Sequence, residues 1–87
     1  MTRVAIPSQL TAYTGGATRV EAEGDTVAAM LDDLDRRFPG LKFRVVDEQD
    51  RIRRHMRVFV GQTEAKRLDV PVGVADELLI FGALSGG

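Results

Sequence analysis

Residues 24–40 read GDTVAAMLDDLDRRFPG, and this stretch decides the fold. Its apolar side chains recur at i, i+3, i+4, i+7 and i+11, the spacing of a single stripe along an α-helix. They are Val27, Met30, Leu31, Leu34 and Phe38. Asp25 or Thr26 can act as the N-cap by accepting a hydrogen bond from an early helical N–H, and the Pro-Gly pair at 39–40 ends the helix. The stretch therefore predicts one amphipathic helix whose apolar stripe forms one side of the core.

Two short strands are expected before this helix, at residues 3–6 and 18–22. Pro7 closes the first strand, because proline lacks the N–H that a central ladder needs. Residues 8–14 have room for one helical turn, and Gly15-Gly16 marks a loop. In the second strand apolar and charged residues alternate, which is typical of a half-buried strand.

After the helix the pattern is less regular. Residues 41–46 suggest a strand or an irregular apolar cover, and residues 47–50 suggest a turn. Strands are predicted at residues 56–60 and 77–81. Residues 68–74 contain a proline and a glycine, which favour a short edge piece or a loop over a central strand.

This order of elements predicts an α+β fold of the β-grasp (ubiquitin-like) type, a mixed sheet of four to five strands packed on one main helix. In that arrangement the first and last strands lie side by side in the centre of the sheet. We expect residues 1–81 to form the β-grasp domain and residues 82–87 to form a flexible C-terminal tail that ends in Gly-Gly.

Strand alternation assigns the side chains of the two best-defined strands to opposite faces of the sheet. The face toward the helix would carry Met56, Val58, Val60, Leu78 and Ile80. Phe59, Leu79 and Phe81 would then point away from the helix and form a candidate partner-docking patch. An alternative remains open at this point: residues 41–46, or a different register, would cover these three side chains.

Composition narrows the class of function. A chain of 87 residues forms one small domain without room for a deep catalytic cleft, and its net charge of −1 gives no global field that would attract nucleic acid or an anionic membrane. The absence of cysteine excludes a thiol nucleophile and thiolate zinc ligands, and the single histidine, His55, has no second histidine to form a metal site. No metal site is predicted. We expect a cytoplasmic protein, since no segment approaches the length of a membrane span.

A basic run occupies residues 51–57, RIRRHMR. In a chain with a sequence pI near 5.7, one such cluster is usually a solvated loop and strand start. Docking onto an acidic partner is the alternative interpretation.

The last two residues, Gly86 and Gly87, present a terminal carboxylate on a thread without side chains. Such a thread can enter a channel that any Cβ would block, because glycine tolerates whatever backbone angles the channel imposes. Leu84 is the one large apolar side chain of the tail, and we expect it, with Ser85, to contact a partner protein.

Several short segments occur in a characteristic order: Gly24-Asp25-Thr26-Val27, Arg37-Phe38-Pro39-Gly40-Leu41, Val58-Phe59-Val60, Asp76-Glu77-Leu78 and the final Gly86-Gly87. In this the chain resembles the bacterial ubiquitin-like sulfur carriers of the MoaD/ThiS family. Within that family, residues 13–16 and 47–54 are most similar to the carriers that serve cysteine biosynthesis in actinobacteria. The chain departs from the family pattern at Gly82-Ala83, where a proline is usual shortly after the last strand.

The resemblance implies a protein co-substrate rather than an enzyme. An E1-like adenylating enzyme would use ATP to activate Gly87, a sulfurtransferase or sulfide source would convert it to a thiocarboxylate, and a sulfur-accepting synthase would consume the sulfur. No bound cofactor, nucleic acid or membrane partner is implied. The acceptor stays open between a cysteine precursor, a pterin and a thiazole. Two other functions compete, a modifier joined to lysines of other proteins and a β-grasp binding module without tail chemistry.

Overall fold

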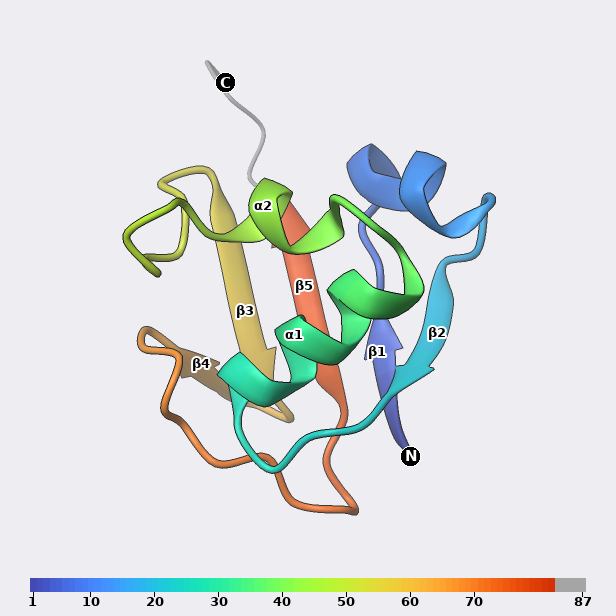
Figure 1. The fold of residues 1–87 in the computed structure, drawn as a ribbon. Coiled ribbons are helices and arrows are strands. Elements are labelled where there is room, and N and C mark those ends of the chain that lie inside the picture. Colours follow the sequence, from blue (N-terminus) through green and yellow to red (C-terminus); the bar gives the residue numbers. More distant parts are fainter. Residues whose placement is uncertain (83–87) are drawn as a thin grey trace.

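The computed structural model describes residues 1–82. These residues form a five-stranded mixed sheet whose one face is covered by the main helix, as predicted (Figure 1). The elements in chain order are β1 (Thr2–Ala5), the 3₁₀ helix η1 (Ser8–Thr14), β2 (Arg19–Ala22), α1 (Val27–Arg37), α2 (Leu41–Val45), β3 (Met56–Val60), β4 (Thr63–Ala65) and β5 (Leu78–Gly82).

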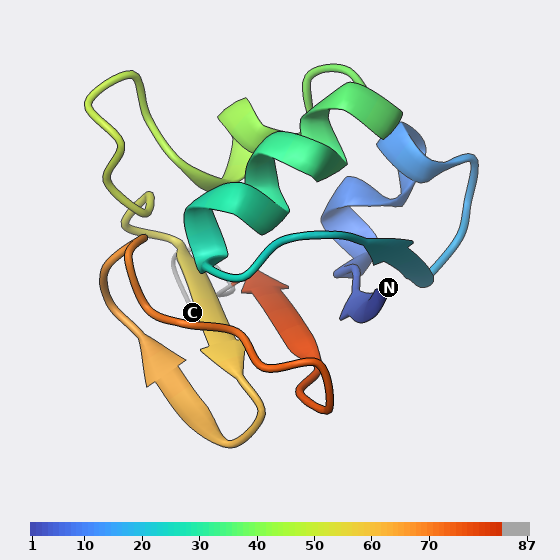
Figure 2. The same ribbon diagram turned by 60° about the horizontal axis from the view of Figure 1, so that its bottom comes forward.

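The strand order in the sheet is β2-β1-β5-β3-β4. β1 and β5 run parallel at the centre, with Val4 opposite Leu78, while β1–β2, β3–β5 and β3–β4 are antiparallel pairs. The expected central neighbours, the first and last strands, are therefore confirmed. Both helices lie on the same side of the sheet, so the opposite face of the strands remains uncovered by either helix (Figure 2).

Helix α1 forms as its sequence predicts. Thr26 is the N-cap, and its hydroxyl accepts a hydrogen bond from the Ala29 N–H at 3.1 Å. The stripe residues Val27, Met30, Leu31 and Leu34 are completely buried, while Phe38 at the C-cap is partly buried against the core. The helix stripe and the sheet together make one hydrophobic core, and burial of this stripe is what holds the helix in place.

Residues 41–46 do not form a strand or an irregular cover. They form the short helix α2, entered through Gly40, whose φ of 94° lies in the left-handed region that glycine tolerates. Leu41 and Val45, spaced i and i+4, are buried, while Phe43 between them is 53% exposed. Apolar residues at positions 41, 43 and 45 alternate as in a strand, but the two that are buried have helical spacing, and the segment is a helix.

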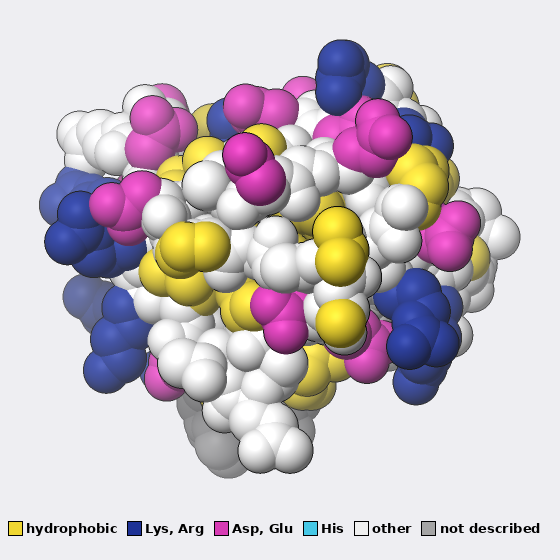
Figure 3. Space-filling model, turned by 90° about the horizontal axis from the view of Figure 1, so that it is seen from below, with side chains coloured by type: hydrophobic (Ala, Val, Ile, Leu, Met, Phe, Trp, Pro, Cys, Tyr) yellow, Lys and Arg dark blue, Asp and Glu magenta, His cyan; other side chains and the backbone are white. Residues whose placement is uncertain are grey.

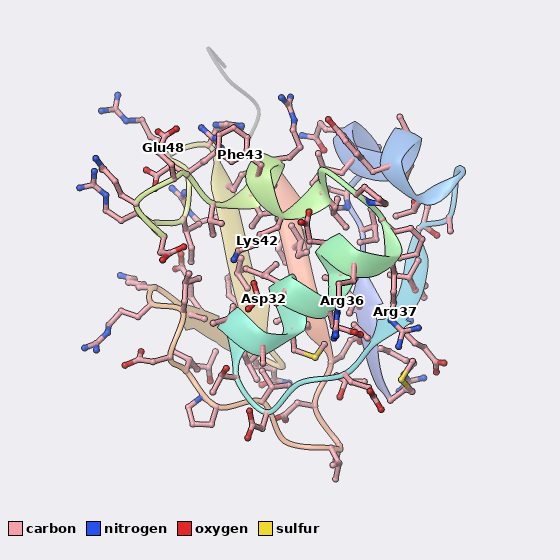
Figure 4. The ribbon with its side chains drawn as sticks, in the orientation of Figure 1. Asp32, Arg36, Arg37, Lys42, Phe43 and Glu48 are labelled. Atoms are coloured by element: carbon pink, nitrogen blue, oxygen red, sulfur yellow. The ribbon has the colours of Figure 1, made fainter. Side chains whose placement is uncertain are left out.

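Two aspartates of α1 form ion pairs that tie the helices to their surroundings. The Lys42 ammonium of α2 donates to the Asp32 carboxylate of α1 at 2.6 Å, and this hydrogen bond raises the pKa of Lys42 (Figure 4). The second aspartate is Asp33, whose buried carboxylate accepts hydrogen bonds from the Glu23 N–H at 2.8 Å, from Arg37 at 2.7 Å and from Arg36 at 2.6 Å. The hydrogen bond from the Glu23 N–H is the main cause that holds the pKa of Asp33 below its ordinary value, and the hydrogen bond from Arg37 is the second.

Strand β4 is missing from the sequence-based interpretation. It is only three residues long, two of them, Thr63 and Glu64, are polar, and it pairs with β3 across a turn at Gly61-Gln62, where Gly61 has a φ of 61°. Residues 68–74 form a loop with one isolated bridge between Thr26 and Pro71, in line with the predicted loop or edge piece. The segment at residues 8–14 is longer than the single turn expected, because it forms a seven-residue 3₁₀ helix.

Within residues 1–82, no helix has the length and apolarity needed to span a bilayer.

Candidate docking face and strand end

The exposed face of the sheet carries the three residues predicted for docking. Phe59 in β3 lies opposite Leu79 in β5, and Phe81 is the next outward-facing residue of β5. The rings of Phe59 and Phe81 meet edge to face, with centroids 5.6 Å apart. Phe81 is 47% exposed, and the other two side chains are partly buried. The predicted face assignment is confirmed, while the role of this face in docking remains a prediction.

The alternative in which residues 41–46 cover this face is wrong. Leu41 and Val45 of α2 are buried in the core on the helix side, where α2 packs against α1. The side chains predicted to face the helix are also confirmed there: Met56, Val58, Leu78 and Ile80 are buried, and Val60 packs partly buried against the core. The register of β3 and β5 therefore separates a core face from an open face.

The C-terminal end of β5 lies at the same end of the molecule as η1 and α2 (Figure 1). Gly82, the last described residue, pairs with Met56 at the beginning of β3. The other predicted functional residues, Leu84, Ser85, Gly86 and Gly87, lie outside the described residues. Any chemistry at the C-terminus thus begins from the end of a strand that is paired on both sides.

Sequence reasoning missed one residue at this strand end. The side-chain amide of Gln9, in η1, donates a hydrogen bond to the Gly82 carbonyl at 3.3 Å. A Cβ at residue 82 would lie 2.7 Å from the Gln9 Cδ, so any side chain larger than hydrogen would have to displace Gln9. No sequence signal joins two residues 73 positions apart, because only the parallel pairing of β1 and β5 brings them together.

The opposite end of the molecule has a different surface. Figure 3 shows that its hydrophobic side chains form separate groups, with acidic side chains and uncoloured surface (other side chains and backbone) between them. The most exposed of the large apolar residues, Val74, is 96% exposed in the loop before β5. Among residues 1–82, no group of three or more histidine, aspartate and glutamate side chains is arranged to hold a metal ion.

Comparison with known proteins gives one consistent result. Relatives named sulfur carrier protein CysO, from Mycobacterium bovis and Mycobacterium tuberculosis, are each 29% identical over 89 residues, covering 97% of this chain and 96% of the relative. Among solved structures, the Amycolatopsis orientalis BexX/CysO complex contains a chain with a TM-score of 0.91 and 36% identity, matched over 100% of both chains.

A second group of similar structures comes from archaea. The small archaeal modifier protein SAMP1 of Haloferax volcanii has a TM-score of 0.76 and 30% identity, with coverage of 99% of this chain and 98% of that chain. These ubiquitin-like neighbours confirm the β-grasp fold. The family model described as ThiS family matches residues 4–87, which is nearly the whole sequence. This chain belongs to the ThiS family.

Proposed function

We propose that this protein is a sulfur carrier of the CysO type, which becomes loaded with sulfur as a thiocarboxylate on Gly87. The observation that carries the proposal is the family match over residues 4–87, together with curated relatives that carry the name sulfur carrier protein over nearly their full length. Proteins of this kind are co-substrates rather than catalysts. The enzymes that act on them supply the chemistry, and the carrier supplies a recognisable surface and a reactive end.

The chemistry proceeds in two steps. A carboxylate is a poor electrophile because its negative charge is delocalised over two oxygens. In the first step, a Gly87 carboxylate oxygen attacks the α-phosphate of ATP on an E1-like adenylating enzyme, pyrophosphate leaves, and an acyl-adenylate forms. In the second step, sulfide attacks the acyl carbon and AMP leaves with the bridging oxygen. The product is a thiocarboxylate, whose sulfur is a better nucleophile than a carboxylate oxygen.

The fold supports delivery of such an end. β5 is the central strand, fixed by β1 on one side and β3 on the other, so Gly82 provides a firm starting point. Six residues, 82–87, span at most about 20 Å at roughly 3.3 Å per residue. This length is sufficient for a terminal carboxylate to reach a recessed active site while the β-grasp domain docks outside it.

Docking is assigned to the open sheet face. The aromatic pair Phe59 and Phe81, with Leu79 beside it, forms an apolar surface next to the strand that leads to the C-terminus. Interfaces are often dominated by buried aromatic side chains near their centre. In this proposal Leu84 and Ser85 add contacts within the partner, and the same face serves both the adenylating enzyme and the sulfur-accepting synthase in turn.

The name of the mycobacterial relatives favours a cysteine precursor as the sulfur acceptor. The activating step consumes ATP, so we place the pathway in the cytoplasm. The acceptor assignment is tested by mixing the loaded protein with a candidate cysteine-precursor synthase and its amino acid substrate. Return of the Gly87 thiocarboxylate to a carboxylate by hydrolysis, together with formation of free cysteine that carries the sulfur, supports it, and unchanged loaded carrier contradicts it.

The loading itself is tested by intact-protein mass spectrometry. The full chain is incubated with its cognate E1-like enzyme, ATP and sulfide, and the expected gain is that of sulfur replacing one oxygen. A variant lacking Gly87 is the matched control, since it keeps the whole β-grasp domain and lacks only the proposed reactive residue. A sulfur gain by the deletion variant would contradict the proposal.

A second candidate function has one specific observation in its favour, the similarity to the small archaeal modifier protein of Haloferax volcanii. A modifier would use the same adenylated end, but its acyl carbon would be attacked by a lysine amine of another protein. Recovery of Gly87 in amide linkage to lysine side chains in the native cell extract would favour this function. Recovery of the free thiocarboxylate alone would favour the carrier.

A further inference from the structure

The basic run at residues 51–57 contributes to a surface feature that the proposed function does not use. Four cationic side chains, Arg53, Arg54, Arg57 and Lys66, line a shallow hollow that also contains one carboxylate, from Glu64. We call these four cations with their surrounding surface the basic hollow. The chain as a whole carries a net charge of −1, so this local excess of positive charge is a distinct feature of one region.

The basic hollow borders both parts of the candidate site. Met56, which also lines it, pairs with Gly82, so the hollow lies beside the end of β5. Arg57 pairs with Phe81, and its alternation with Val58 places it on the open sheet face with the two phenylalanines. A protein that contacts Phe81 and receives the C-terminus must therefore approach this hollow as well.

Two of the arginines are held in place by contacts within the protein. The Arg53 guanidinium lies 4.7 Å from the centroid of the Phe43 ring, and its Nε donates to the Phe43 carbonyl at 2.8 Å. Figure 4 shows Phe43 at the end of the molecule where β5 finishes. Arg57 Nη1 donates to the carbonyls of Arg54 and Met56, each at 2.9 Å. Arginines fixed in this way lose little side-chain entropy when they bind a partner.

The charges of the basic hollow are incompletely neutralised. The only carboxylate that lines it, Glu64, lies 3.6 Å from the Arg57 Nε. Within residues 1–82, Arg54 and Lys66 form no salt bridge. These two side chains are exposed, so they are available to carboxylates on another protein.

We propose that the basic hollow docks onto aspartate and glutamate side chains that surround the entrance through which the E1-like enzyme admits the C-terminus. This inference rests on the proposed function, because that function is what brings an enzyme to the end of β5. The layout matches that of a protein interface, in which charged residues form a rim around an apolar centre. A nucleic-acid-binding domain typically carries a basic stripe and has a basic overall charge, whereas this chain has a net charge of −1.

Charges on the rim of an interface act mainly on the rate of association and its salt dependence. Steering by complementary charges raises association rates by about 10-fold to 1,000-fold, and salt weakens the effect. The basic hollow is therefore expected to orient the carrier before the aromatic face makes contact. Its removal should slow association more than it speeds dissociation.

The test measures association of the full chain with the cognate E1-like enzyme by stopped-flow fluorescence at low and at high salt. The variant Arg54→Gln/Lys66→Gln removes two positive charges from the basic hollow. The matched control Arg19→Gln/Arg36→Gln removes two positive charges from exposed side chains of β2 and α1. The expected result is an association rate about tenfold lower for the hollow variant at low salt, a difference that shrinks at high salt, and little change for the control.

An equal decrease for both variants, or no decrease for either, would overturn the proposal, because the effect would then come from total charge or from no charge at all. Preferential binding of a short single-stranded RNA by the wild type over the hollow variant at physiological salt would also overturn it, in favour of a nucleic-acid site. Sulfur loading of the wild type is followed in parallel by mass spectrometry. If association depends on the basic hollow but the wild type gains no sulfur, the docking site is supported and the proposed function is rejected. If the wild type is loaded normally but the hollow variant associates as fast as the wild type, the proposed function is supported and the docking site is rejected.

Discussion

The two faces of the sheet use the same strands for different purposes. On the helix side, Val58 and Ile80 are fully or almost fully buried against the α1 stripe. One residue further along the same strands, Phe59 and Phe81 point to the other side, where Phe81 is 47% exposed. Apolar side chains on the covered face stabilise the domain. Those on the open face are less buried and remain accessible, and we propose that a partner docks there. The covered face is therefore called the stability face, and the open face the proposed docking face.

The largest expected effect is on the stability face. Leu31→Ala or Leu34→Ala removes a completely buried side chain from α1 and leaves a cavity. Each substitution should lower the free energy of unfolding by about 2 to 5 kcal/mol, a large part of the stability of so small a domain. Urea denaturation followed by circular dichroism measures this loss. A loss below about 0.5 kcal/mol for both variants, the range of ordinary surface substitutions, would break the distinction between the faces.

The docking face should show the reverse pattern. Phe81→Ala should weaken binding to the E1-like enzyme by about 2 kcal/mol or more, because an interface aromatic often dominates binding energy, while the fold stays intact. Isothermal titration calorimetry measures the affinity, and circular dichroism checks the fold. Val74→Ala is the control, since Val74 is 96% exposed at the far end of the molecule. Unchanged affinity for Phe81→Ala would move the docking surface elsewhere.

The pH dependence of stability tests the role of Asp33, the buried aspartate of α1 on the helix side of the sheet. The Glu23 N–H, with Arg37, lowers the pKa of Asp33, so the ionised form is favoured in the folded state. Its contribution is present above the ordinary aspartate pKa of 3.8 and is lost as the pH falls through the lower folded value. Asp33→Asn should therefore be less stable than the wild type at neutral pH and lose less stability on acidification. Urea midpoints measured from neutral to acidic pH check this, and parallel profiles for the two proteins would contradict it.

A smaller effect is expected at the strand end. Gln9→Ala removes an exposed hydrogen bond to the Gly82 carbonyl and should cost no more than about 1 kcal/mol of stability. We expect a modest decrease in the rate of sulfur loading, because the end of β5 loses a contact that fixes its direction. Gln9→Glu is the matched control, since it keeps the side-chain length but replaces the donor with an acceptor. Loading by Gln9→Glu at the wild-type rate, with Gln9→Ala slow, would show that the hydrogen bond is not the cause.

Much of this fold follows directly from the sequence. The i, i+3, i+4, i+7 stripe identified α1, and the two-residue alternation in β3 and β5 placed Phe59, Leu79 and Phe81 on the open face. These signals succeed because each depends on the period of a single element. The open face was therefore predictable without any knowledge of tertiary contacts.

Other parts depend on tertiary contacts and could not be predicted in the same way. Residues 41–46 contain four apolar residues at mixed spacing, and only packing of Leu41 and Val45 against the core selects the helix. β4 has no apolar pattern and exists because β3 offers it an edge. The contact between Gln9 and Gly82 requires the parallel pairing of β1 and β5, which joins opposite ends of the chain.

The central claim is that Gly87 carries the sulfur, and the most direct test is tandem mass spectrometry of the loaded protein after protease digestion. The mass gain of one sulfur in place of one oxygen should be confined to the C-terminal peptide and to its final residue, Gly87. The gain should also require both ATP and the E1-like enzyme. Sulfur located on any other residue, or gained without ATP, would contradict the account.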